Sequence, residues 1–106
     1  MIETILEEVF QEKVLESDTP VLVEFYAGWS GPGKLMHKHL LDLMSKYNYH
    51  LKVYSIPVDE NSSIMKEYNI KAYPTLLFFN KGRIIEKIIG APSIEETEKI
   101  INRLIN

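Results

Sequence analysis

Residues 21–34 read VLVEFYAGWSGPGK. The first part, Val21–Ala27, is a nearly continuous apolar run, which is typical of a strand buried on both faces of a sheet. The second part, Gly28–Gly33, is rich in small residues and predicts a loop, and a helical pattern follows over Lys34–Tyr47. One carboxylate, Glu24, interrupts the apolar run, and a buried carboxylate must either take up a proton or find hydrogen-bond donors.

Strand and helix patterns alternate on both sides of this stretch. The predicted strands and helices follow one another in the order β-α-β-α-β-α-β-β-α. This order predicts an α/β fold of three layers, with helices on both faces of a mixed central sheet. We expect most of that sheet to be parallel, and the closing hairpin to add an antiparallel edge. The expected strands are Ile2–Leu6, Val21–Ala27, Leu51–Val58, Thr75–Phe79 and Ile84–Ile89, and the expected helices are Glu7–Ser17, Lys34–Tyr47, Asp59 or Asn61 to Asn69, and Ser93 to Leu104.

Composition narrows the class of protein. The chain has 106 residues, of which 45% are hydrophobic and 25% charged, and this favours one domain over residues 1–106 with a modest core. A net charge of −3, with Lys and Arg scattered among Asp and Glu, argues against nucleic-acid binding. No run approaches the ~20 apolar residues of a membrane span. The first residues lack a signal-peptide pattern, so we expect a cytoplasmic protein.

The chain contains no cysteine. This excludes a disulfide framework, a Cys-ligated metal site and a thiol nucleophile. The three histidines, His37, His39 and His50, do not have the spacing of metal ligands, so we expect no metal site and no cofactor.

Trp29-Ser30-Gly31-Pro32-Gly33-Lys34 resembles the thioredoxin family, whose signature at this place is Trp-Cys-Gly-Pro-Cys-Lys. Val58-Asp59-Glu60-Asn61, Tyr73-Pro74-Thr75 and Gly90 continue the resemblance over essentially the whole chain. They look like the family's strand end, its cis-proline motif and the glycine after its last strand. The resemblance implies the thioredoxin fold and, for the family, thiol–disulfide exchange.

The resemblance fails at the two cysteines. The family's nucleophilic cysteine falls on Ser30 and its resolving cysteine on Gly33. Disulfide exchange needs a thiolate that attacks sulfur and a second thiol, and neither serine nor glycine supplies one. We therefore expect no dithiol catalysis by this chain. Glu24 falls on the family's buried aspartate, the proton acceptor for the resolving thiol, and the family's lysine partner falls on Ser55.

In the family, the loops that meet beside the reactive sulfur form a shallow apolar patch for extended peptides, and the residue before the cis-proline leaves its backbone free to pair with substrate. We therefore expect a redox-inactive module that binds a protein or an extended peptide, as a monomer. An alternative is an active-site variant of a genuine thioredoxin, a protein disulfide oxidoreductase of cell redox homeostasis, whose two cysteines are replaced. The expected binding residues are Trp29, Ser30, Gly31, Pro32, Tyr73, Pro74, Gly90 and Ala91.

Two other readings concern the start of the helix after the loop. Ser30 suits an N-cap better than a nucleophile, because His37 and His39 lie some 10 Å further along the helix. The free amides of a helix start also attract anions, so an anion or small-molecule site at Ser30–Lys34 is a third alternative. We expect Glu24 to survive as a relic of redox chemistry or to reach water through the space at Gly33.

Overall fold

The computed structural model describes residues 2–27, 31–47, 50–57 and 62–105, and for residues 31–33 it describes the backbone alone. A five-stranded sheet has the strand order β1-β3-β2-β4-β5. The strands are β1 (Glu3–Thr4), β2 (Val21–Tyr26), β3 (Lys52–Pro57), β4 (Thr75–Asn80) and β5 (Arg83–Ile89). The helices are α1 (Gly31–Lys46), α2 (Ser63–Glu67) and α3 (Ile94–Ile105), and two short helical segments, η1 (Glu7–Val9) and η2 (Gln11–Leu15), precede β2.

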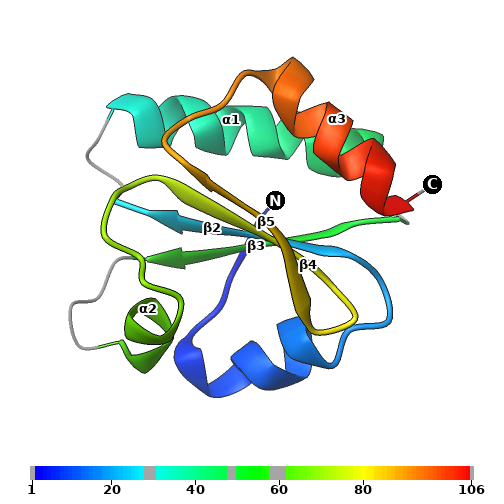
Figure 1. Ribbon diagram of the computed structural model, residues 1–106. Helices are drawn as coiled ribbons and strands as arrows, with labels where there is room; N and C mark the ends of the chain where they lie inside the picture. The colour runs from blue at the N-terminus through cyan, green and yellow to red at the C-terminus, as the bar shows by residue number, and fades with distance from the viewer. Residues whose placement is uncertain (1, 28–30, 48–49, 58–61, 106) are drawn as a thin grey trace.

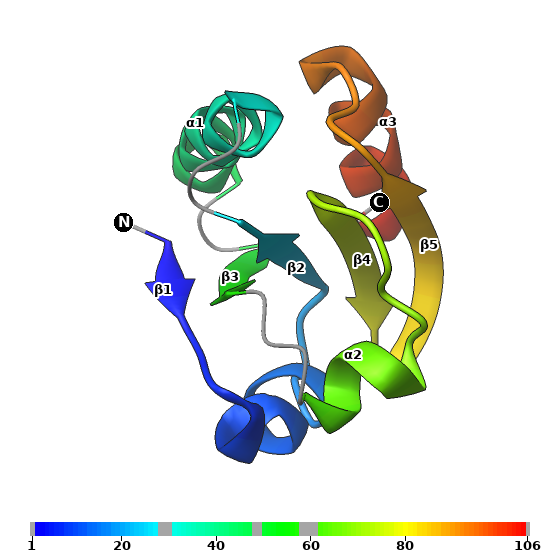
Figure 2. The same cartoon turned by 90° about the vertical axis from the view of Figure 1, so that its left-hand side faces the viewer.

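The helices cover both faces of the sheet. The helices α1 and α3 lie side by side on one face, and α2 lies with η1 and η2 on the other (Figures 1 and 2). Between the sheet and α1 and α3 lies one buried cluster that includes Leu22, Leu40 and Phe78. A second cluster, on the opposite face, includes Phe10, Phe25 and Phe79. The expected three-layer arrangement around a mixed sheet is confirmed.

The expectation of a mostly parallel sheet is wrong. Strand β3 runs parallel to both β1 and β2, but β4 runs antiparallel to β2 and to β5. The expectation assumed that each helix returns the chain to the starting edge of the sheet. The short helix α2 does not, because Phe25 near the end of β2 pairs with Thr75 at the start of β4. The chain thus re-enters the sheet at the edge where β2 and β3 end.

The reversed direction of β4 decides what meets at this edge. Thr75, the first residue of β4, pairs with Ile89, the last residue of β5. The ends of β2, β3 and β5 and the beginning of β4 therefore lie at one edge of the sheet, and α1 starts soon after β2 leaves it. The loops that the sequence singled out all connect to this edge.

Three of the predicted helices differ in detail. The second, expected from Lys34, already begins at Gly31, within the expected loop. The first, expected over Glu7–Ser17, is a 3-10 segment followed by a π-helical one. Leu6, which precedes it, supplies no capping side chain, and the Glu16 N–H reaches back to the Gln11 carbonyl, at 2.9 Å. The third starts later than expected, because Ser62 caps it by accepting a hydrogen bond from the Met65 N–H. Asp59 and Asn61 lie outside the described residues.

The start of α3 agrees with the sequence. The Ser93 hydroxyl accepts a hydrogen bond from the Glu96 N–H at 3.1 Å, as its capping position predicts. Among the described residues, no helix combines the length and apolar character that a membrane span requires.

Candidate functional site

The sheet edge described above brings together two of the expected binding segments. The Gly90 N–H donates a hydrogen bond to the Pro74 carbonyl at 2.8 Å, so the segment before β4 is tied to the segment after β5. Gly90 has a φ of +95°, a conformation that other residues rarely adopt. Ala91, the next residue, is exposed. Tyr73, Pro74, Gly90 and Ala91 are therefore neighbours.

The other expected binding residues lie on the loop between β2 and α1. Trp29 and Ser30 are outside the described residues, and their predicted roles, including the N-cap role of Ser30, stay predictions. Gly31 and Pro32 form the first turn of α1, and the structure describes only their backbone.

The segment before β4 is fixed by short-range contacts. The Tyr73–Pro74 peptide bond is cis. Pro74 and Thr75 are buried, and the Thr75 hydroxyl donates to the Ala72 carbonyl at 2.6 Å. Tyr73 is half-buried and packs against the cluster on the α2 face. Within the described part of the chain, neither the N–H nor the carbonyl of Tyr73 forms a backbone hydrogen bond.

Sequence reasoning missed one residue of this edge, Ile89. Its side chain is 65% exposed although it ends an apolar strand. Because it pairs with Thr75, it lies beside the Tyr73–Pro74 segment. The sequence carried a signal, since Ile89 directly precedes Gly90 at the end of its strand. We call the surface formed by Tyr73, Ile89, Gly90 and Ala91, next to the buried Pro74, the Tyr73–Ile89 surface.

Glu24 lies on β2 beneath α1 and has no solvent exposure. One carboxylate oxygen, Oε1, accepts hydrogen bonds from the Ser55 hydroxyl at 3.0 Å and from His37 Nδ1 at 3.1 Å. The other oxygen, Oε2, has no hydrogen-bond partner among the described residues. Glu24 therefore finds donors on two neighbouring elements, β3 and α1, as a buried carboxylate requires.

The expected contact of Glu24 with water near Gly33 is wrong, because Glu24 has no solvent exposure. The expectation that Glu24 is a relic of redox chemistry stays a prediction, and the sequence does not link Glu24 to a histidine. The imidazole is 38% exposed, so it joins a buried carboxylate to the surface of α1. His37 also lies near the ring of Tyr26, with ring centroids 5.9 Å apart. An imidazole on α1 thus contacts Glu24, where the resemblance implied a lysine on β3.

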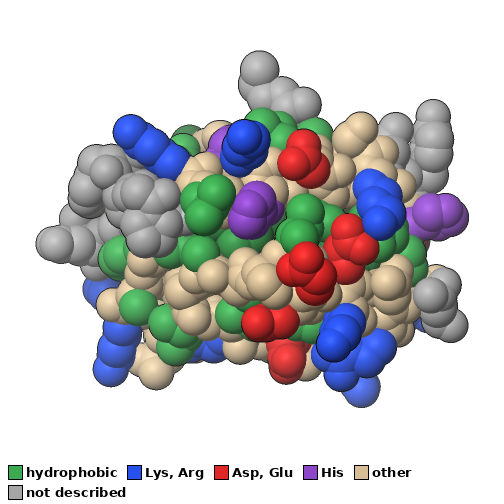
Figure 3. All heavy atoms as spheres, turned by 90° about the horizontal axis from the view of Figure 1, so that it is seen from above, with side chains coloured by type: hydrophobic (Ala, Val, Ile, Leu, Met, Phe, Trp, Pro, Cys, Tyr) green, Lys and Arg blue, Asp and Glu red, His purple; other side chains and the backbone are tan. Residues whose placement is uncertain are grey.

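Other possible sites on the described residues are less developed. No three His, Asp or Glu side chains of the described residues gather in a way that would hold a metal ion. On the face formed by α1 and α3, positive, negative and apolar side chains are interspersed (Figure 3). This face therefore does not carry the clustered positive charge that is typical of a nucleic-acid-binding surface.

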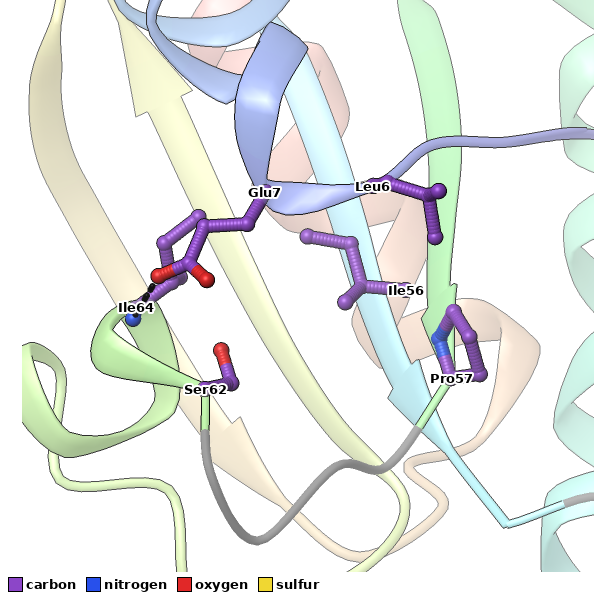
Figure 4. Close-up of a pocket in the computed structure, with 6 residues that line it drawn as sticks. All are labelled: Leu6, Glu7, Ile56, Pro57, Ser62 and Ile64. Atoms are coloured by element: carbon purple, nitrogen blue, oxygen red, sulfur yellow. Dashed lines mark hydrogen bonds between the residues drawn. The ribbon is translucent and has the colours of Figure 1, made fainter.

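A small cavity of about 80 Å³ lies between η1, the end of β3 and α2. Figure 4 shows the Glu7 carboxylate pointing from η1 toward the start of α2, where it accepts a hydrogen bond from the Ile64 N–H at 3.1 Å. The Ser63 hydroxyl also donates to this carboxylate. Among the described residues, the one charged group that lines the cavity is therefore engaged in joining η1 to α2. The remaining lining residues are Leu6, Ile56, Pro57, Ser62 and Ile64.

Comparison with known proteins agrees with this geometry. The family model described as Thioredoxin matches residues 1–104. The chain is 41% identical to "Thioredoxin M4, chloroplastic" of Arabidopsis thaliana over 91% of its own length and 50% of the relative's. It is 34% identical to "Thioredoxin" of Porphyra purpurea over 92% of its length and 91% of the relative's. A third relative, "Thioredoxin M-type, chloroplastic" of Spinacia oleracea, is 44% identical over 77% of this chain and 45% of its own.

The chain spans about half the length of the two chloroplastic relatives and nearly all of the algal one. Thioredoxins belong to a family of thiol–disulfide oxidoreductases, and this chain has no cysteine with which to carry out dithiol exchange. The matched family model, the sheet topology and the positions of the Tyr73–Pro74 and Gly90 segments lead to one conclusion: this chain is a member of the thioredoxin family.

Proposed function

We propose that this chain binds an extended segment of a protein partner at the Tyr73–Ile89 surface and performs no redox chemistry there. In this proposal the neighbouring loop contributes to the same surface and completes its apolar area. The residues of that loop are Trp29, Ser30, Gly31 and Pro32.

The observation that carries the proposal is an unpaired backbone beside an exposed apolar side chain. Within the described part of the chain, the backbone of Tyr73 makes no hydrogen bond, and Ile89 is 65% exposed next to the same segment. An extended peptide satisfies both features, because its main chain pairs with the free backbone and its apolar side chains cover Ile89. Exposed apolar surface without a partner is a solubility liability.

Affinity measurements with surface variants test this proposal. Candidate partners and a cysteine-free Val/Thr-rich decapeptide would be titrated against the wild type and a Trp29→Ala, Tyr73→Ala double variant by calorimetry. We expect binding to the wild type and a loss of at least roughly tenfold in the double variant, the scale of removing aromatic contacts at an interface. A Leu41→Ala variant, which truncates an exposed side chain on α1, serves as the control. Equal affinities for all three proteins would remove the proposal.

A second candidate is an active-site variant of a genuine thioredoxin. It is favoured by the printed names of the relatives, which are thioredoxins. The parent protein would carry cysteines at positions 30 and 33. Sequencing these two codons in the native gene separates the two candidates, because cysteine codons there would assign disulfide reduction to the natural protein.

We further propose that the chain is a monomeric, cytoplasmic, single domain. The relatives named above and others like them include chloroplastic and mitochondrial proteins, so the cellular location of this chain needs a direct measurement. Sedimentation of the purified protein and imaging of a tagged full-length gene product test the oligomeric state and the location separately.

A further inference from the structure

Lys87 joins β5 to the segment that leads from α2 to Tyr73. Its ammonium group donates to the Tyr68 carbonyl at 3.0 Å and to the Asn69 carbonyl at 3.0 Å. None of the ion pairs formed among the described residues includes Lys87. The charge of this lysine is therefore directed at two backbone carbonyls rather than at a carboxylate.

The end of α2 explains why these two carbonyls need a donor. Asn69 has a φ of +56°, and its N–H bonds the Lys66 carbonyl while the Ile70 N–H bonds the Met65 carbonyl. This is the arrangement that commonly ends a helix, and it satisfies two of the last carbonyls. The carbonyls of Tyr68 and Asn69 come later in the chain and are the ones that Lys87 reaches. A cation at this end also interacts favourably with the helix dipole.

The same strand, β5, holds the other end of the segment. Three residues after Lys87, the Gly90 N–H donates to the Pro74 carbonyl at 2.8 Å. The chain between Asn69 and Pro74, which contains Tyr73, is thus attached to β5 at both of its ends. Ile89 lies between the two attachment points, and residues 87 and 89 of a strand point to the same face.

We propose that Lys87 is a positioning residue for the Tyr73–Ile89 surface. It fixes the distance between the Tyr73 segment and Ile89, and thereby the shape that an extended peptide meets. The inference rests on the proposed function in so far as it concerns peptide affinity. The effect on the position of the segment is independent of any ligand.

Hydrogen exchange of the Gly90 amide tests the positioning directly. This amide is protected by the bond to Pro74, so its exchange reports how often the segment moves away from β5. In Lys87→Met, which keeps most of the length of the side chain but removes the donors, we expect the Gly90 amide to exchange at least roughly fivefold faster relative to the core amide of Leu22. Lys87→Arg, which restores a cationic donor, should return the ratio to within roughly twofold of the wild type.

Lys46→Met is the matched control, because Lys46 makes its contacts with Glu98 on the opposite face of the sheet. It should leave the Gly90 ratio unchanged. If Lys87→Met folds poorly, Lys87→Leu supplies a second variant without donors. An unchanged Gly90 ratio in the folded Lys87 variant would overturn the inference, whether or not any peptide binds.

Peptide affinity gives the second readout. We expect the Val/Thr-rich decapeptide to bind Lys87→Met at least roughly threefold more weakly than the wild type and the Lys46→Met control, a change within the range for residues that act through others. If the wild type does not bind, the proposed function fails and the exchange measurement still decides the role of Lys87. If the wild type binds and Lys87→Met binds equally well, the positioning role in recognition is wrong.

Discussion

Two regions at the same edge of the sheet differ in how they depart from the thioredoxin pattern. In the first region, Ser30 and Gly33 stand in the sequence where the family has cysteines, and beneath α1 the buried carboxylate Glu24 accepts hydrogen bonds from His37 and Ser55. Across the edge, Tyr73, Pro74 and Gly90 keep the family's residue pattern and lie together. The two cysteine positions have changed, whereas the Tyr73–Ile89 surface, which we call the contact region, keeps the family's framework. The framework of the fold therefore does not depend on the residues of the exchange reaction.

The largest expected effect reverses the loss in the first region. We expect a Ser30→Cys, Gly33→Cys double variant to gain disulfide reduction against a protein disulfide, from none in the wild type, because it restores both thiols that the exchange requires. Turnover with a chemical reductant as electron source measures it. Ser30→Cys alone is the control, since it lacks the resolving thiol. A correctly folded double variant without turnover would show that the surroundings, including Glu24 and His37, no longer support the reaction.

The second prediction concerns the hydrogen bonds of Glu24. Replacing His37 by alanine leaves the buried carboxylate with the Ser55 hydroxyl as its remaining described donor. We expect the free energy of unfolding to fall by about 1–3 kcal/mol at neutral pH, the cost of an unsatisfied buried group, with partial compensation by water because the imidazole is 38% exposed. Chemical denaturation measures this loss.

Two further variants make the cause specific. His50→Ala changes an exposed histidine and should alter stability by no more than about 0.5 kcal/mol. In a Glu24→Gln background, His37→Ala should cost less than in the wild type, because the carboxylate that needs the donor is gone. Equal costs in the two backgrounds would show that His37 acts independently of Glu24.

The third prediction belongs to the contact region. We expect Ile89→Ser to weaken binding of an extended peptide roughly tenfold, while stability changes by less than about 0.5 kcal/mol, because the side chain is exposed and contributes little to the core. Calorimetric titration and denaturation measure the two quantities. Ile85→Ser on the same strand is the control, as Ile85 is 50% exposed and lies away from Tyr73 in the sheet register. Similar losses in both variants would indicate general apolar attraction rather than a defined site.

The smallest expected effect is a pH dependence of stability that arises from Tyr68, at the end of α2. Burial, followed by the charge of Glu67, raises the pKa of Tyr68 above its ordinary value of 10.0. As the pH rises past 10.0, the unfolded chain loses this phenolic proton before the folded chain does, so the stability present at lower pH decreases. Tyr68→Phe should reduce this decline in stability at alkaline pH. An identical decline in the variant, measured by denaturation at several pH values, would assign the effect to other groups.

The sequence predicted the element order and the candidate loops because both depend on local patterns. Ser93 before Glu96 indicated the start of α3, and the apolar run interrupted by Glu24 indicated a buried carboxylate. The direction of β4 was not predictable from local patterns, since a connection through a short helix can cross the sheet or return to the same edge. The loop residues nearest the replaced cysteines stay predictions, because Trp29 and Ser30 lie outside the described part of the chain.

The contacts that depend on the packing of distant elements were the hardest to predict. Whether His37 or His39 reaches Glu24 depends on the rotation of α1 over β2, which a helical pattern fixes only coarsely. The same holds for Lys87. In the sequence it is an ordinary charged residue of a predicted strand, and its contacts with the Tyr68 and Asn69 carbonyls depend on where α2 packs against β5. In the sequence, Ile89 is one more apolar residue of a predicted strand, and its exposure follows from its position at the end of the edge strand.

The most direct test of the comparison between the two regions is a nuclear magnetic resonance titration of the labelled wild-type protein with the Val/Thr-rich decapeptide. If the contact region binds extended segments without redox chemistry, the amide signals of Tyr73, Thr75, Ile89 and Gly90 will shift together and saturate, while those of α3 stay in place. No saturable shift at these residues, or shifts confined to the face formed by α1 and α3, would contradict the proposal that the chain retains a working binding surface after losing its cysteines.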